Sequence, residues 1–217
     1  MIKLTKLLQT VIDRSDMIVE AFLQHIALSF ISLFIGVLIA LPAGMLIARH
    51  RKYAESAIGV AAVLQTIPSL ALFGFLVPLI GIGSKTALIA LIVYALLPIL
   101  RNTYAGLTGV DQAIIEAGRG MGMTENQILK KIEFPIALPF IMAGIRTATI
   151  LTVGIATLAT FVGAGGLGDV IYRGLQSYNN YLVLAGAVPV AVLAIMFDVI
   201  LRFIEKVVTP KGLKISK

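Results

Sequence analysis

The sequence has 217 residues, of which 59% are hydrophobic and only 13% are charged. A soluble domain carries charge on roughly a quarter of its residues. Too little charge remains here to cover a water-facing globule, so the composition excludes an ordinary soluble domain. The sequence contains no cysteine, which also excludes a disulfide framework and a metal site built from thiolates.

Formal charge is missing from long blocks of the sequence, and these blocks predict about five transmembrane helices. A helix needs about 20 apolar residues to cross the hydrocarbon layer of a membrane. The third block is the shortest, and packing against residues 67–80 would stabilise it as a span. One block holds a single charge, Arg146, and the others hold none; the blocks are residues 21–48, 57–84, 86–100, 135–168 and 181–197.

The expected fold is therefore all-α: a polytopic membrane helix bundle of about five spans with a cytoplasmic two-helix loop. We expect an extracytoplasmic segment at residues 1–20 and a transmembrane domain at residues 21–208, which includes the loop at 101–135. A basic cytoplasmic tail follows at residues 209–217. No small-x-small cleavage site follows the first block, so we expect that block to remain as a helix and not to be removed as a signal peptide.

Basic residues cluster after alternate blocks, and this pattern predicts the orientation of the chain. Short cytoplasmic loops of membrane proteins are rich in Lys and Arg. Lys85 and Arg173 stand alone after the second and fourth blocks, which places those loops and the N-terminus outside the cell and the C-terminus in the cytoplasm. The net charge of +7 then reflects topology, and nucleic-acid binding is disfavoured because the charges form no stripe. The clusters comprise Arg49, Arg51, Lys52, Arg101, Arg119, Lys130, Lys131, Arg202, Lys206, Lys211, Lys214 and Lys217.

The long polar stretch at residues 101–135 predicts two short helices joined at a glycine bend. Asp111 is a plausible N-cap of the first helix, and glycines at 120 and 122 interrupt it. Thr124, with Gln127 three residues later, forms the pattern of a capping box that begins the second helix. We expect Pro135 to end that helix. From periodicity alone, two alternatives remain about equally open: a connector packed on its own bundle, or a docking element for a cytosolic partner.

The same stretch resembles the EAA signature of bacterial ABC importer permeases. That signature reads Glu-Ala-Ala, three residues, Gly, nine residues, then Ile-x-Leu-Pro. Gly118 replaces the second alanine and Phe134 replaces leucine. Residues 66–72, 96–104, 144–149 and 163–168 are similar to the glycine betaine/carnitine/choline branch of the family, and the methionine branch is less similar. The residues at the signature positions considered for docking are Glu116, Ala117, Gly118, Gly122, Ile132 and Pro135.

The resemblance implies a permease in the bacterial cell membrane that imports a compatible solute such as glycine betaine, carnitine or choline for osmoprotection. The signature residues would then dock into a groove on the ATPase. The implied partners are two ATPase subunits, a second permease chain (identical or paralogous), an extracytoplasmic substrate-binding protein and membrane lipid. ATP and magnesium would bind the ATPase, so this chain would carry no cofactor and would not be an enzyme. The alternatives are another ABC importer, such as one for methionine, and an ATPase-independent channel or scaffold.

Catalytic and ion-coupled classes find little support in the sequence. His25 and His50 are the only histidines, and they fall at opposite ends of the first predicted helix, so they cannot share a hydrolytic or metal site. No Gly-x-x-x-x-Gly-Lys-Ser/Thr run exists that would bind ATP in this chain. An ion-coupled transporter would need several intramembrane acids, and Asp198 alone is thin support.

Several residues inside the blocks are candidates for a translocation path or gate. The polar site at Gln65, Thr66, Pro68 and Ser69 could line the path, although a simple proline kink is slightly favoured. Glycines at residues 163–168, beside Asp169, are too concentrated for a helix and suggest an outer gate or a contact for the binding protein. No aromatic cage for a quaternary ammonium group is evident.

Arg146 and Asp198 are charges placed inside apolar blocks, so we expect them to face each other or water and not lipid. A local pair between Asp198 and Arg202 is the competing arrangement, and a structural role is favoured over gating.

Thr152 and Thr160 belong to a stripe of small residues that recurs every fourth position. Such a stripe lets helices approach closely. Packing within the chain is favoured over contact with a second permease, although both can hold. The other members of the stripe are Gly144, Ala148 and Ala156.

Overall fold

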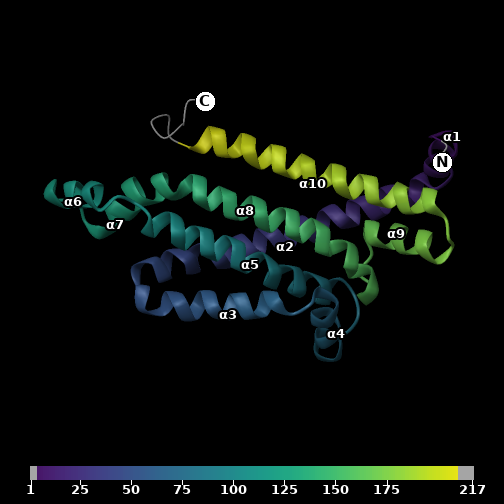
Figure 1. The fold of residues 1–217 in the computed structure, drawn as a ribbon, viewed down its shortest axis with the longest axis horizontal. Helices are drawn as coiled ribbons and strands as arrows, with labels where there is room; N and C mark the ends of the chain where they lie inside the picture. The colour runs from purple at the N-terminus through teal and green to yellow at the C-terminus, as the bar shows by residue number, and fades with distance from the viewer. Residues whose placement is uncertain (1–3, 210–217) are drawn as a thin grey trace.

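The computed structural model describes residues 4–209, and within that range all regular secondary structure is helical (Figure 1). A short amphipathic helix, α1 (Leu4–Asp13), precedes the bundle. Two 3-10 turns, η1 (Arg51–Tyr53) and η3 (Thr157–Val162), and one π-turn, η2 (Leu129–Glu133), complete the secondary structure. The other helices are α2 (Ser15–Arg49), α3 (Ala54–Thr66), α4 (Ser69–Ile80), α5 (Ser84–Thr108), α6 (Gln112–Gly120), α7 (Glu125–Ile128), α8 (Phe134–Ala156), α9 (Leu167–Gln176) and α10 (Asn180–Val208).

Four helical runs are long and apolar enough to cross a membrane, and a bent pair raises the number to five. The prediction of about five spans is thereby confirmed. The third block, however, was expected to be the weakest span, and it is not. The third block forms the 25-residue α5, which is the most enclosed of the four long runs. The second block is broken instead, into α3 and α4, whose axes differ by 95°.

Proline explains the break between α3 and α4. Ile67 ends α3 in an extended conformation with ψ of 126°, and Pro68 follows it. The proline ring disfavours helical geometry in the residue before it, so the helix ends there. Tyr94 of α5 donates its hydroxyl hydrogen to the carbonyl of Ile67, which provides a partner for a backbone group exposed by the break.

Helix α5 is the centre of the bundle and packs between α2 and α8. Its buried face is rich in small residues, which let helix backbones approach one another closely. A Cβ on Gly36 of α2 would lie 3.0 Å from the Cβ of Ala95, and a Cβ on Gly44 would lie 2.7 Å from that of Thr103. On the other side, a Cβ on Gly144 of α8 would lie 2.7 Å from the carbonyl oxygen of Pro98.

The connections alternate between two ends of the bundle, as Figure 1 shows. Helices α6 and α7 lie at one end, together with the C-terminal end of α10. We call this the loop end. Helices α1, α4 and α9 lie at the opposite end, which we call the α9 end. The two termini of the described chain therefore lie at opposite ends, as an odd number of crossings requires.

The small-residue stripe packs within the chain, as favoured from the sequence. Gly144, Ala148, Thr152 and Ala156 are all buried. Thr152 is fully buried and its hydroxyl has no hydrogen-bond partner among the residues that the structure describes. Thr160 lies in η3 and donates a hydrogen bond to Asp169 of α9.

Arg146 and Asp198 do not face each other, which was one of the arrangements expected from the sequence. Arg146 of α8 pairs with Glu205 of α10 instead, with 3.0 Å between Nη1 and Oε2. Asp198 takes the competing local arrangement, 2.8 Å from Arg202. Glu205 lies two turns beyond Asp198 on the same helix, nearer the loop end. A long arginine side chain extends toward the nearer end of a span, so it reaches this acid before Asp198.

Candidate functional site

Helix α6 is an amphipathic helix whose two faces have different contacts. Asp111 caps it, because its carboxylate accepts a hydrogen bond from the backbone N–H of Ala113 at 2.9 Å. Ile115 on the inner face is buried in a cluster that includes Val110 and Ile128. The outer face remains exposed and carries apolar side chains at helical spacing: Ile114 and Ala117 within α6, and Met121, which is 74% exposed, at its C-cap.

The bend between α6 and α7 depends on Gly122 and on a capping box. Gly122 has φ of +78°, a left-handed conformation that glycine adopts without a steric cost. Thr124 then begins α7: its hydroxyl accepts from the N–H of Gln127 at 3.3 Å, and the Gln127 side chain accepts from the N–H of Thr124 at 2.8 Å. Both sequence predictions, the glycine bend and the capping box, are confirmed.

Pro135 does not end the second helix, contrary to expectation. Helix α7 runs through the π-turn η2 directly into α8, so that Glu125–Val162 is one helical run of 38 residues. In the π-turn the N–H of Phe134 bonds to the carbonyl of Leu129. Pro135 follows this turn directly, at the start of α8. The π-turn already departs from the regular i→i−4 bonding pattern, so the run continues past a residue that lacks an N–H. Likewise, residues 101–108 of the predicted loop are the last turns of α5.

The six signature residues divide into an inner and an outer group. A Cβ on Gly118 would lie 2.8 Å from Cδ1 of Ile132, so this glycine lets α6 pack closely on η2. Its small size thus serves contact within the chain. Glu116 and Ala117 are exposed, and nothing lies within 4 Å of a Cβ built on Gly122. These three residues, unlike Gly118, remain free to meet another molecule.

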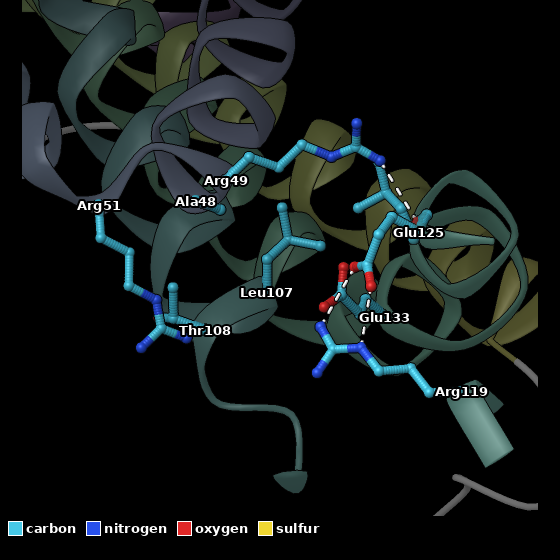
Figure 2. A pocket seen from close by; sticks show the side chains of 9 residues that line it. Ala48, Arg49, Arg51, Leu107, Thr108, Arg119, Glu125 and Glu133 are labelled. Carbon is cyan, nitrogen blue, oxygen red and sulfur yellow. Dashed lines mark hydrogen bonds and ion pairs between the residues drawn. The ribbon is translucent and has the colours of Figure 1, made fainter. Parts of the chain in front are cut away.

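A polar joint connects this loop to the end of α2 (Figure 2). Arg49 reaches across from α2 and donates to the side-chain oxygen of Asn126 at 2.8 Å. It also approaches the backbone carbonyl of Glu125 at 3.4 Å. Arg119 of α6 pairs with the Glu125 carboxylate, with 2.8 Å between Nε and Oε1. A cavity of about 380 Å³ lies between these groups, and Glu133 contributes to its wall.

The electrostatics of the joint favour its charged form. The hydrogen bond from Arg119, together with the charge of that guanidinium, outweighs desolvation and holds the pKa of Glu125 below its ordinary value. Both side chains are largely exposed, at 49% and 67% for Arg119 and Glu125. An exposed pair contributes little stability, so we interpret the joint as positioning α6 and α7 relative to α2.

Sequence reasoning missed this joint. In the sequence, Arg49 was used only as evidence for the orientation of the chain. Its hydrogen-bond partner Asn126 lies 77 positions away, so no local pattern connects the two residues. The Arg119–Glu125 pair spans the glycine bend, so it does not follow the spacing of a helical pair. Glu205 was missed because it falls beyond the charge-free block that ends at residue 197.

The polar site on the second block lies at the proline break. Gln65 donates to the backbone carbonyl of Tyr94 at 3.4 Å, and the Thr66 hydroxyl donates to the carbonyl of Val63 at 2.7 Å. Both side chains therefore have backbone partners, which agrees with the kink interpretation. Pro68 is exposed and Ser69 begins α4.

The glycine-rich stretch at the α9 end is a turn followed by a helix. Gly163, Gly165 and Gly166 have positive φ angles, so this part is non-helical as predicted. Gly168, however, lies within α9, where a Cβ would sit 1.9 Å from the carbonyl oxygen of Thr157. Its backbone is in such close contact that no other residue fits. The expectation of a wholly non-helical stretch was therefore wrong at its end, because close packing and not a turn requires this glycine.

Comparison with known proteins identifies the family. A family model described as "Binding-protein-dependent transport system inner membrane component" matches residues 36–210. The chain is 47% identical over 191 residues to the choline transport system permease protein OpuBB of Bacillus subtilis, covering 88% of each chain. It is equally similar to the glycine betaine/carnitine/choline permease protein OpuCB of that organism. It is 39% identical over 208 residues to the osmoprotectant import permease protein OsmW of Salmonella typhimurium, covering 94% of this chain and 97% of that protein.

Solved structures agree with the sequence comparisons. A chain of the MetNI methionine ABC transporter in an inward-facing conformation superimposes with a TM-score of 0.83 and 27% identity, covering 91% of this chain and 99% of that one. An amino acid ABC transporter with histidines has a TM-score of 0.68 over 91% of this chain and 97% of its own; at 19% identity it supports the fold alone. This chain therefore belongs to the family of inner membrane components of binding-protein-dependent transport systems, the multi-pass permeases of ABC importers.

Proposed function

We propose that this chain is the permease through which an ABC importer moves a small quaternary ammonium solute of the glycine betaine, carnitine or choline class into the cell, for osmoprotection. Relatives that share 47% of their residues with this chain over 88% of its length are named for transport of these solutes. Methionine import is less favoured, because the MetNI chain shares only 27%.

The observation that carries the proposal at the level of mechanism is the exposed outer face of α6. Ile114, Ala117 and Met121 form an apolar stripe, although α6 is anchored to the bundle by its opposite face. Exposed apolar side chains at the tip of a loop are typical of a docking surface. In this proposal an ATPase subunit covers the stripe, and Glu116, Ala117 and Gly122 meet it directly.

The orientation of the chain follows from the same proposal. The loop end, with the basic residues Arg49, Arg119 and Arg202, faces the cytoplasm, and the α9 end faces outward toward a substrate-binding protein. A second permease chain, identical or paralogous, completes the membrane part. ATP and magnesium bind the ATPase subunits. Residues such as Gln65, Pro68, Thr152 and Asp198 remain candidates for the path.

Uptake of labelled solute tests the proposal. The chain is expressed with its ATPase, binding protein and any second permease in cells that lack their own osmolyte importers, and uptake of glycine betaine, carnitine and choline is measured. We expect accumulation of at least one solute, and its loss when the ATPase carries a hydrolysis-deficient mutation. Uptake that survives this mutation would indicate a channel, and absence of uptake of all three solutes would refute the substrate class.

Gly122 provides a test of docking within the same cells. A Cβ built at this position meets no atom of its own chain within 4 Å, so the cost of Gly122→Trp within the chain comes mainly from the positive φ and is about 1–2 kcal/mol. Gly122→Asn is the matched control, because asparagine tolerates this conformation. We expect Trp to abolish uptake with normal membrane insertion, and Asn to retain most of it. Equal uptake by both variants would contradict docking at this bend.

A further inference from the structure

A second polar cavity lies at the α9 end of the molecule, far from the loop just described. It has a volume of about 580 Å³ and is lined by side chains of α2, η3 and α9, including Gln24, Thr160, Asp169, Tyr172 and Arg173. A smaller cavity of about 130 Å³ adjoins it and shares Gln24, Asp169 and Arg173. The larger cavity would easily hold a solute of about ten heavy atoms, since small-ligand sites begin near 300 Å³.

The wall of this cavity is fixed by hydrogen bonds between distant segments. The hydroxyl of Thr160 donates to the carboxylate of Asp169, which ties η3 to α9. The side-chain oxygen of Gln24 accepts from the backbone N–H of Gly166 at 3.1 Å, which ties α2 to the glycine turn. Gln24 in turn donates to Glu20, the acid that lines the adjoining cavity, at 3.1 Å. Gln24 and Asp169 are therefore held in place before any ligand arrives.

Two opposite charges line the cavity without forming an ion pair with each other. Asp169 and Arg173 are one helical turn apart on α9, a spacing at which Cβ atoms lie about 5–6 Å apart. Yet neither is in an ion pair within 4 Å among residues 4–209, although other arginines of that range are. The cavity thus presents a separated carboxylate and guanidinium.

An aromatic ring completes the arrangement. Tyr172 lines the cavity and packs edge-to-face against Phe161, with ring centroids 5.2 Å apart. Tyr172 remains 37% exposed, so part of its ring is open to a ligand. Aromatic faces attract quaternary ammonium groups, and a guanidinium binds a carboxylate strongly.

We infer that this cavity is a binding site on the permease itself for a zwitterionic quaternary ammonium solute. The trimethylammonium group lies against Tyr172 and near Asp169, and the solute carboxylate meets Arg173. The inference rests on the proposed function, since it takes the substrate class and the outward orientation from there. It adds a selectivity: a carboxylated solute such as glycine betaine binds better than choline, which has no partner for Arg173.

Direct binding to the assembled complex of permease and ATPase, without the binding protein, tests the site. Glycine betaine and choline affinities are measured by scintillation proximity at millimolar concentrations. We expect Arg173→Gln to weaken glycine betaine binding about tenfold, the effect of losing one charge-assisted hydrogen bond, and to leave choline binding unchanged. Lys85→Gln, which removes an exposed positive charge at the same end of the bundle but outside the cavity, should change neither.

Two further variants separate recognition from folding. Tyr172→Phe keeps the ring and should retain both affinities, and Tyr172→Leu should weaken both. The site is overturned if the wild-type complex binds neither solute, or if Arg173→Gln leaves the ratio of the two affinities unchanged. It is also overturned if that variant weakens both equally. Uptake by the whole importer distinguishes failure of this inference from failure of the proposed function. If the importer takes up the solute but the complex shows no such binding, only the inference is rejected. If there is no uptake, the inference and the proposed function are both rejected.

Discussion

The ion pair between Arg146 and Glu205 should stabilise the contact between α8 and α10 measurably. Both side chains are mostly enclosed, at 26% and 22% exposure, and their atoms approach to 3.0 Å. Arg146 lies 12 residues after Phe134, or about 18 Å along the helix axis. If the pair were broken, water could therefore hydrate neither charge fully.

The expected size of the effect follows from this geometry. Two unit charges at 4 Å attract by about 4 kcal/mol at an effective dielectric constant of 20, and desolvation offsets part of that gain. The Glu205 Oε2 atom approaches Arg146 without a well-aligned hydrogen bond. We therefore expect a coupling energy of about 2 kcal/mol, within the range of about 0.5–3 kcal/mol found for contacting residues.

A double-mutant cycle measures this coupling. The variants Arg146→Gln, Glu205→Gln and their combination are purified in detergent, and their thermal unfolding is compared with the unmutated chain. At about 2–4 °C per kcal/mol for a chain of this size, each single variant should lower Tm by about 4–8 °C. The double variant should be more stable than the sum of the two single effects predicts.

The neighbouring pair on α10 provides the control for this cycle. Asp198 and Arg202 belong to one helix and Arg202 is 63% exposed, so that pair should contribute only about 0.3–0.5 kcal/mol. Arg202→Gln should then shift Tm by less than about 2 °C. The reasoning fails if the effects of Arg146→Gln and Glu205→Gln are simply additive, or if Arg202→Gln destabilises as much as Arg146→Gln.

Three other predictions test the packing and the loop. Gly144→Ala should lower Tm in detergent, since the new Cβ would lie 2.7 Å from a backbone oxygen. Gly154→Ala on the same helix is the control and should leave Tm unchanged, because its Cβ meets nothing within 4 Å. Equal Tm values for the two variants would contradict the packing. Arg119→Gln should raise the pKa of Glu125 toward its ordinary value in a carbon-13 NMR titration. With the pair intact, its contribution to stability is present at neutral pH and is lost as the pH falls through the lowered pKa of Glu125. An unchanged titration would refute the pairing. Thr124→Ala should speed amide hydrogen exchange in α7 by about fivefold, because the lost cap contributes about 1 kcal/mol. Thr124→Ser keeps the hydroxyl and should leave the exchange rate unchanged. Equal exchange rates in the two variants would rule out a role for the cap.

Local signals in the sequence predicted local structure well. Asp111, Gly122 and Thr124 each act on backbone groups within three residues, and all three roles are confirmed by the structure. The charge-free blocks predicted the spans because the membrane sets a simple requirement of length and apolarity. The resemblance in residues 116–135 pointed to the family, which the comparisons confirm.

What the sequence did not predict depends on contacts between distant segments. Arg146 could not be assigned to Glu205 because the choice between two acids on α10 depends on how far that helix is shifted along α8. Gly118 was expected to face the ATPase, and only the packing of Ile132 reveals that it faces inward. Pro135 was expected to end a helix, since proline normally interrupts one. The helix continues because a π-turn precedes this proline, and that turn has no sequence signature.

The uninterrupted run from Glu125 to Val162 has a mechanical consequence. At 1.5 Å per residue, its 38 residues form a rod roughly 57 Å long. One tip carries the Glu125 carboxylate held by Arg119, and the other lies just beyond Thr160, which is tied to Asp169. If this run moves as one rigid piece with its middle held against α5, a sideways push at one tip would swing the other tip in the opposite direction. Opening at one face of the membrane and closing at the other would then be a single tilt.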